Sequence, residues 1–311
     1  MHLFELCEST PQRSGPSVPE WVLGCFRRRS ITFFTGTEDV ATEVIWLQSR
    51  GLTADYRRTP PGVGVTSLAA LRDLALSELL ALARVEGGFA HTRWDGELMH
   101  WSDWTAFQTH AKWPEPGRLT RVGGCMVELA PSGAYVEDWR HQPSLRGGPL
   151  IGLELIDERD VRAGVVRHRG GGLIVCGEHA GFVRGRPEPL PEGGTLEDYV
   201  RAHARDEAAL ARVFSLDAAY GVAGASRDDF TVTLATLPWR EGGPLLSLEG
   251  FAPARDGVVL QRVEEAGRLI ERRFRVDTLE QAFESAPGTP VERATREWFE
   301  REVGAPSATG R

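Results

Sequence analysis

The chain has 311 residues, with 36 Lys and Arg, 44 Asp and Glu and a formal net charge of −8. At roughly 100–200 residues per domain, this length favours two domains, and the 41% of hydrophobic residues can fill packed cores. The acidic balance argues against a nucleic-acid partner, because phosphate binding needs a positive surface, and no apolar run approaches the roughly 20 residues of a membrane-spanning helix.

The first residues and the cysteines indicate the cellular compartment. The opening segment, residues 1–8, is short and acidic and lacks the pattern of a secretory signal. The four cysteines are dispersed and form no CxxC pair, which predicts free thiols in a reducing compartment. We therefore expect a cytoplasmic protein without a membrane partner.

Short strand-like segments fill most of the first half of the chain. Gly, Pro and Asp-Gly turns separate them, a pattern typical of barrels and sandwiches. One helix, at about 67–85, interrupts them, with Ser67 as its candidate N-cap. The strand-like segments are 31–34, 44–48, 52–57, 89–93, 98–107, 119–129 and 135–140.

The second half has the same organisation after a linker-like stretch at 142–149 that is rich in Gly and Pro. A helix at about 195–213 begins at Thr195, again a candidate N-cap. The Thr-Pro-Val-Glu sequence at 289–292 is a capping box, which predicts a C-terminal helix at about 290–303. The strand-like segments are 151–156, 173–175, 182–184, 218–222, 230–237, 245–251, 258–263 and 269–276.

The two halves match at a constant offset of 128 residues. Ser67 corresponds to Thr195, and the apolar run at 43–47 corresponds to the run at 171–175. Two helices rich in Ala, Leu and Arg can also match by composition alone, but the matching apolar runs upstream favour an internal duplication.

One long helix in each half leaves no room for repeated βαβ units, which disfavours a doubly wound sheet. We predict a mainly β fold of two tandem antiparallel barrels. The first domain spans 1–145 and the second 146–311, each with one inserted helix, and the C-terminal helix follows in the second.

Several segments, taken in order, resemble a small group of double β-barrel proteins. Its named member is a budding-yeast protein found as a partner of a casein-type kinase, and the group has bacterial relatives. The resemblance implies a lipocalin-like double barrel and no particular activity. The group has a Trp-His pair in its Trp-rich strand, whereas the order here is His100-Trp101. The segments that carry the resemblance are 21–31, 44–48, 54–57, 87–90, 135–139 and 182–187.

Asp95-Gly96 is a strong signal for a two-residue type I′ turn. With that turn, His91 lies directly opposite His100, with Cβ atoms roughly 4.5–5.5 Å apart. Two imidazoles at this distance are candidates for acid–base chemistry, and the alternative is a pair on the surface. A metal site needs a third ligand, and nothing at ligand spacing supplies one, so we expect no metal.

The segment 52–57 places Asp55 and Arg57 on one face of a strand. If this face lines a wet cavity, Asp55 is a candidate base and Arg57 a clamp for developing negative charge. Alternatively, both side chains face bulk water. On the preceding strand, Trp46 and Gln48 share a face, and a wall of this kind suits a ligand pocket.

On the strand at 135–140, Tyr135, Glu137 and Trp139 share a face. A glutamate that faces into a barrel has a raised pKa and suits proton transfer. The two aromatic residues, together with Trp101 and Trp104 of the Trp-rich strand, are candidates for contact with a ligand.

Motifs for nucleotide cofactors, P-loop chemistry, zinc proteases and serine-hydrolase elbows are absent, so we expect no cofactor. The first hypothesis is an enzyme of lyase or isomerase type that transforms a small, largely apolar molecule by acid–base chemistry. The second is a carrier of such a molecule, and the third is a scaffold for a protein partner. A homo-oligomer is compatible with all three.

Overall fold

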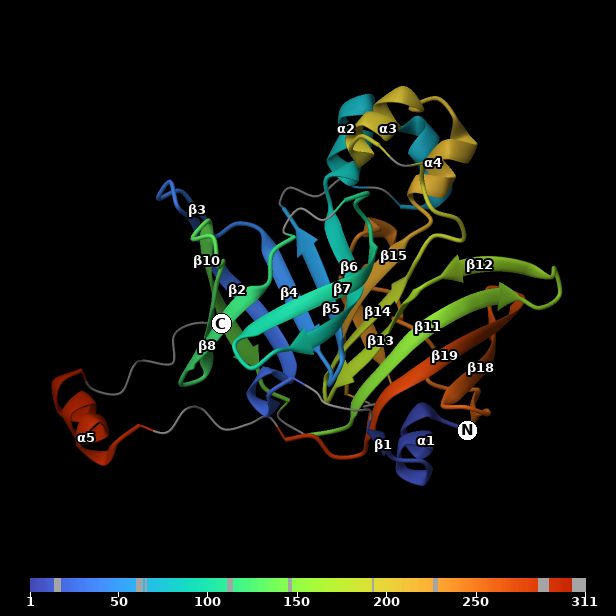
Figure 1. The fold of residues 1–311 in the computed structure, drawn as a ribbon. Helices are drawn as coiled ribbons and strands as arrows, with labels where there is room; N and C mark the ends of the chain where they lie inside the picture. Colours follow the sequence, from blue (N-terminus) through green and yellow to red (C-terminus); the bar gives the residue numbers. More distant parts are fainter. Residues whose placement is uncertain are drawn as a thin grey trace.

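A computed structural model of the chain has a mainly β architecture, as predicted. Two antiparallel sheets lie side by side, and the short helices α2, α3 and α4 lie together over one end of the pair (Figure 1). The residues that the structure describes are 1–13, 18–59, 64, 66–110, 114–144, 147–191, 193–225, 229–284 and 291–303.

The first sheet closes into an eight-stranded antiparallel barrel, because β10 pairs with both β9 and β2. This barrel was predicted and is confirmed. An eight-stranded barrel has an interior wide enough for side chains or for one small ligand. Its strands are β2 (Gly24–Phe33), β4 (Glu43–Gln48), β5 (Leu52–Arg58), β6 (Glu86–Trp94), β7 (Leu98–Ala106), β8 (Gly117–Val122), β9 (Cys125–Leu129) and β10 (Tyr135–Gln142), and the short β3 (Glu38–Asp39) pairs with β2 outside the ring.

The second sheet follows the same order, with β11 in the place of β2 and β19 in the place of β10, and these two strands pair. Within the described residues, no strand pairing joins its end strands β16 and β17, so a second closed barrel stays a prediction. The strands are β11 (Leu150–Asp160), β12 (Val165–Arg169), β13 (Gly171–Cys176), β14 (His179–Arg184), β15 (Asp217–Ala223), β16 (Phe230–Ala235), β17 (Phe251–Pro253), β18 (Val258–Glu265) and β19 (Arg268–Glu280), with β1 (Gln12–Arg13) on β19.

Each predicted long helix is in fact a pair of short helices, so the prediction of one continuous helix per half is wrong. In the first half, Leu74 adopts an extended backbone that separates the two helices. In the second, the Asp206 carboxylate accepts a hydrogen bond from the Ala209 amide and starts a new helix. The pairs are η2 (Leu68–Asp73) with α2 (Leu76–Ala83), and α3 (Leu196–Ala202) with α4 (Glu207–Val213).

Both predicted N-caps are confirmed, and so is a helix near the C-terminus. The Ser67 hydroxyl accepts from the Ala70 amide at 3.3 Å, and the Thr195 hydroxyl accepts from the Asp198 amide at 3.1 Å. The C-terminal helix α5 spans Arg293–Glu302 and buries none of its residues. The Thr and Pro of its predicted capping box, at 289 and 290, lie outside the described residues.

The N-terminal helix α1 (Leu3–Ser9) is part of the second sheet's core. Leu3, Leu6 and Cys7 are buried in one apolar cluster with side chains of β11, β13, β18 and β19. The Leu3 amide donates to the Leu248 carbonyl at 2.8 Å, which fixes the helix there. The domain boundary between residues 145 and 146 remains a prediction. The first residues of the chain contribute to the core of the second sheet, which follows that boundary.

The two sheets pack against each other through a shared apolar layer that includes residues of β4, β5, β13, β14 and β15. Glycines permit this close approach. A Cβ atom at Gly181 would lie 2.2 Å from the Tyr56 hydroxyl, and one at Gly172 would lie 2.4 Å from the Phe89 ring. The outer face of the second sheet therefore supports the wall of the first barrel.

Candidate functional site

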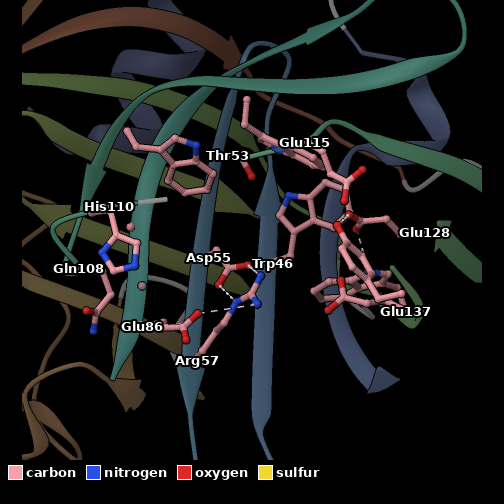
Figure 2. A pocket seen from close by; sticks show the side chains of 17 residues that line it. Trp46, Thr53, Asp55, Arg57, Glu86, Gln108, His110, Glu115, Glu128 and Glu137 are labelled. Carbon is pink, nitrogen blue, oxygen red and sulfur yellow. Dashed lines mark hydrogen bonds and ion pairs between the residues drawn. The ribbon is translucent and has the colours of Figure 1, made fainter. Parts of the chain in front are cut away.

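The barrel contains a cavity of about 140 Å³. A cavity of roughly this volume accommodates one molecule the size of benzene. Strands β4, β5, β6, β7, β9 and β10 all contribute to its wall. Figure 2 shows Asp55, Arg57 and Glu86 close together, apart from Glu128 and Glu137. Of the two alternatives left open for Asp55 and Arg57, the structure has the cavity rather than bulk water, and Glu137 also lies on the cavity wall.

Asp55 and Arg57 form a two-point ion pair along one face of β5. The Arg57 Nε and Nη2 donate to the two Asp55 oxygens at 2.8 and 3.0 Å. Glu86 lies directly across the strand pair from Arg57, with its carboxylate 3.9 Å from the Arg57 Nη1. Burial alone would lower the pKa of Arg57, but the carboxylates of Asp55, Glu137 and Glu86 together outweigh this effect and the pKa is raised. Arg57 is therefore a permanent cation whose charge Asp55 largely compensates.

Glu137 is held by a second arginine, from β2. Arg28 donates through Nη1 to Glu137 at 2.7 Å and through Nη2 to Asp39 at 3.0 Å. Glu137 and Arg28 are both almost fully buried, with 4% of each side chain exposed. Arg28 therefore supplies the counter-charge of the Glu137 carboxylate inside the barrel wall.

Glu128 lies directly opposite Glu137 on the neighbouring strand β9. Its two oxygens accept hydrogen bonds from the Tyr135 hydroxyl at 3.3 Å and from the Trp139 indole N–H at 3.2 Å. Burial raises the pKa of Glu128 to about 8, and the nearby Glu137 carboxylate adds to the shift. At neutral pH Glu128 is consequently mainly a protonated acid, and it faces the arginine-paired Glu137.

Tryptophans form the apolar part of the cavity wall. The Trp46 ring meets Trp139 and Trp101 edge to face, with centroids 5.4 and 6.2 Å apart. The Trp46 N–H donates to Gln48 and the Trp139 N–H donates to Glu128. Trp104 also lines the cavity and is 42% exposed, which places it at the border with solvent. These four rings and Tyr135 line the cavity, and their contact with a ligand stays a prediction.

Gly117 on β8 makes room for this arrangement. A Cβ atom there would lie 2.8 Å from the Glu128 Oε1 and 2.9 Å from the Trp101 ring. Real Cβ atoms essentially never approach another atom this closely, so any larger residue would displace the acid or the indole. Glycine at position 117 is therefore required for Glu128 and Trp101 to occupy these positions.

The predicted register of the two histidines is wrong. Trp94 pairs with Met99, so the turn has four residues rather than two. The Asp95 carboxylate accepts from the amides of residues 97 and 98 and closes this wider turn. As a result, His91 faces Ser102 rather than His100.

Neither histidine lies on the cavity wall. The His100 Nε2 bonds Asp95 at 2.6 Å, and the His91 Nδ1 lies 3.3 Å from Asp103. Both side chains are about a third exposed, at 32% and 39%. The structure thus places them on the outside of the β6–β7 hairpin, away from the groups that surround the cavity.

Gln48 also has a different place from the expected one. It is fully buried, and its amide nitrogen donates to the carbonyls of Ser49 and Leu52 and to the Thr92 hydroxyl. Its oxygen accepts from Trp46. With every polar atom engaged at the β4–β5 turn, Gln48 orients the indole of Trp46 and does not line the cavity.

Sequence reasoning missed Glu128, Glu86 and Arg28. A signal for Glu128 was present, because the Pro-Ser-Gly turn at 131–133 joins two strands in which Glu128 falls opposite Glu137. Glu86 and Arg28 gave no comparable signal. Their positions depend on the pairing of β5 with β6 and on the closure of the ring between β10 and β2.

A second cavity of about 130 Å³ adjoins the first. Arg57 and Glu86 line both, so these two side chains stand between them. Arg28 and Asp39 line only the second cavity. The charged groups therefore form a polar partition at one side of the aromatic chamber.

Comparison with protein-family models, with curated proteins and with solved structures finds no match to this chain. Among the described residues, no cluster of three His, Cys, Asp or Glu side chains is arranged to hold a metal ion. No helix in the described ranges combines the length and apolar character that crossing a bilayer requires. Lys112, the single lysine of the chain, lies outside the described residues.

Proposed function

We propose that the barrel binds a small, largely apolar organic molecule in its cavity and transforms it by proton transfer without a cofactor. The observation that carries this proposal is the raised pKa of Glu128, about 8, on the cavity wall that also holds the arginine-paired carboxylate of Asp55. Two carboxyl groups in one cavity with such different surroundings are a usual basis for assigning an acid and a base. Isomerisation, cyclisation and elimination are the reactions that such a pair supports.

In this proposal Glu128 is the general acid. It donates its proton to one atom of the bound molecule, and a carboxylate on the cavity wall accepts a proton from another atom, so the proton count balances. Asp55 is the candidate base, because each of its oxygens has a lone pair beyond the one that Arg57 uses. Arg57 holds Asp55 in place with two hydrogen bonds. The aromatic wall excludes water and orients the apolar body of the molecule.

The test is incubation of pure protein, at substoichiometric concentration, with a metabolite extract, followed by untargeted mass spectrometry. We expect one compound to be depleted far beyond the amount of protein, with a new mass that reports the reaction type. Glu128→Gln should abolish the depletion, whereas Glu264→Gln, at an exposed surface ion pair, should not. Depletion by Glu128→Gln at the wild-type rate would show that Glu128 is not the acid.

A non-catalytic carrier is the second candidate, and the aromatic wall favours it as much as it favours an enzyme. A neutral Glu128 is also a good hydrogen-bond donor to a ligand that is only bound. The same experiment separates the two, because a carrier retains one compound unchanged and in stoichiometric amount.

A further inference from the structure

We propose that Trp104 closes the solvent side of the barrel cavity and sets the largest ligand that the cavity accepts, and that a β-bulge at Asp103 holds it there. This inference rests on the proposed function, because it names the residue that selects the ligand by size in the same cavity. Three features of the described residues support it: the direction in which the bulge turns Trp104, the freedom of its indole, and the incomplete pairing of the strand that carries it.

The first feature is a β-bulge that turns Trp104 into the cavity. Side chains alternate between the two faces of a strand, so Trp101 and Trp104, three positions apart, would face opposite sides of a regular β7. Both nevertheless line the cavity. The register with β6 explains this, because two residues of β7, Asp103 and Trp104, lie opposite the single Ala90. The extra residue reverses the alternation and brings Trp104 to the inner face.

Asp103 suits the bulge in both its backbone and its side chain. Its φ is +54°, in the left-handed region that Asp adopts more readily than most residues. Its carboxylate accepts from the Ser102 hydroxyl at 3.0 Å and lies 3.3 Å from the His91 Nδ1. The His91 Nε2 in turn lies 3.5 Å from Glu154 of β11. The bulge is therefore connected to the second sheet as well as to its own hairpin.

The second feature is the freedom of the Trp104 indole. Trp46, Trp101 and Trp139 contact one another edge to face, whereas Trp104 has no ring contact and no N–H hydrogen bond among the described residues. Trp104 is 42% exposed, while Trp46 and Trp139 are 3% and 2% exposed. One side of its indole therefore meets the cavity and the other meets solvent. Its removal leaves the contacts of the other three rings intact.

The third feature is the incomplete pairing of β7. The strand pairs with β6 as far as Ala106, but with β8 at only two described positions, the second of which joins Met99 to Gly117. Within the described residues, the stretch that carries Trp104 thus has a partner strand on one side only. A ligand that outgrows the cavity can extend past this stretch once the indole is gone.

The experiment compares phenol with 2-naphthol, which share a hydroxyl group, are neutral at pH 7 and differ by one fused ring. Each is titrated into the full chain, and calorimetry reports binding. Because the cavity holds about one benzene ring, we expect the wild type to bind phenol about tenfold more tightly than 2-naphthol. In Trp104→Ala this order should reverse, since the second ring takes the place of the indole while phenol loses contact with it.

Matched variants separate the position of the indole from general effects. Trp298→Ala removes another half-exposed tryptophan, on α5 outside the barrel, and should keep the wild-type preference. Asp103→Val places a β-branched residue at a positive φ, so the bulge should rearrange and the preference should shift several-fold toward 2-naphthol. Asp103→Asn tolerates this backbone and keeps an acceptor oxygen, so it should preserve the preference. A mere loss of stability would weaken both probes alike.

Each outcome bears on one of the two proposals. An unchanged preference in folded Trp104→Ala, or a wild type that binds 2-naphthol as tightly as phenol, would overturn the size limit and leave the proposed function in place. The same preference in Asp103→Val as in Asp103→Asn would overturn the role of the bulge. No binding of either probe to the wild type or to Trp104→Ala would contradict the cavity as a ligand site, and with it both proposals.

Discussion

Glu128 and Glu137 occupy facing positions on adjacent strands, yet their surroundings differ. Arg28 supports a charge on Glu137, whereas Tyr135 and Trp139 give Glu128 two neutral hydrogen bonds and burial disfavours its charged form. The difference between the two acids therefore comes from their neighbours, and each neighbour can be changed separately.

The first prediction concerns the pH dependence of stability. The pKa of Glu128 is raised from an ordinary 4.5 to about 8. Between these values the folded chain keeps a proton that the unfolded chain has lost, so the free energy of unfolding should fall as pH rises, by up to about 1 kcal/mol per pH unit. Urea unfolding of wild type and Glu128→Gln between pH 5 and pH 9 measures this, and the component should vanish in the variant. Identical pH profiles for the two proteins would contradict a raised pKa.

The second prediction concerns Arg28. Arg28→Met leaves Glu137 buried without its cation, which should lower the free energy of unfolding by about 3–5 kcal/mol. The control is Arg118→Met, because Arg118 pairs with Glu97 at the surface and such pairs contribute at most about 1 kcal/mol. Denaturant titrations of both variants decide the matter, and similar losses in the two would argue against a special role for the buried pair.

In the β6–β7 hairpin, the expected position of the two histidines depended on one local rule, the Asp-Gly signal for a two-residue turn. A side-chain acceptor, Asp95, widens the turn by bonding two backbone amides, and the register follows from that. We expect Asp95→Ala to lower the midpoint of thermal unfolding by a few degrees and Asp95→Asn, which keeps the acceptor oxygen, to lower it less. An equal loss in both variants would mean that the carboxylate charge, rather than the turn, is what matters.

The same hairpin leads to a prediction about function. Since His100 bonds Asp95 outside the barrel, His100→Ala should leave turnover in the extract assay within about twofold of wild type. Loss of turnover in a folded His100→Ala protein would indicate that His100 takes part in proton transfer. It would also contradict the assignment of Glu128 as the general acid.

Strand alternation was the reliable part of the sequence evidence. It placed Asp55 with Arg57 and Glu137 with Trp139 on common faces, and closure of the barrel turned both faces inward. Turn length, helix breaks and cross-barrel partners were not predictable in the same way. They depend on a few hydrogen bonds, such as those of Asp95, or on contacts between strands distant in the chain. The C-terminal capping residues remain outside the described part of the chain.

At the scale of the whole molecule, the two sheets resemble each other in strand order but differ in content. The interior of the second sheet is an apolar cluster, and buried Glu158 and Arg272 form an ion pair at 2.7 Å beside it. The first barrel has the cavity and its facing acids instead. This contrast is why we assign the ligand to the first barrel, and it is consistent with duplication followed by divergence of the two copies.

The contact between the sheets gives the last prediction. Gly181→Ala would bring a Cβ atom within 2.2 Å of the Tyr56 hydroxyl and 2.5 Å of Leu47, so the free energy of unfolding should fall by about 3 kcal/mol. Gly124→Ala is the matched control, because nothing lies within 4 Å of a Cβ atom there. Denaturant unfolding of both variants tests this, and an unchanged Gly181→Ala protein would show that the sheets can separate slightly without loss.

The position of α1 has a consequence for the order of events during synthesis. Leu3 and Leu6 share a cluster with Phe274 and Leu279 of β19, which are made more than 260 residues later. The first barrel can close once β10 has been made, whereas the cluster around α1 is complete only after β19 has followed. The two halves of the molecule can therefore reach their final packing at different stages of synthesis.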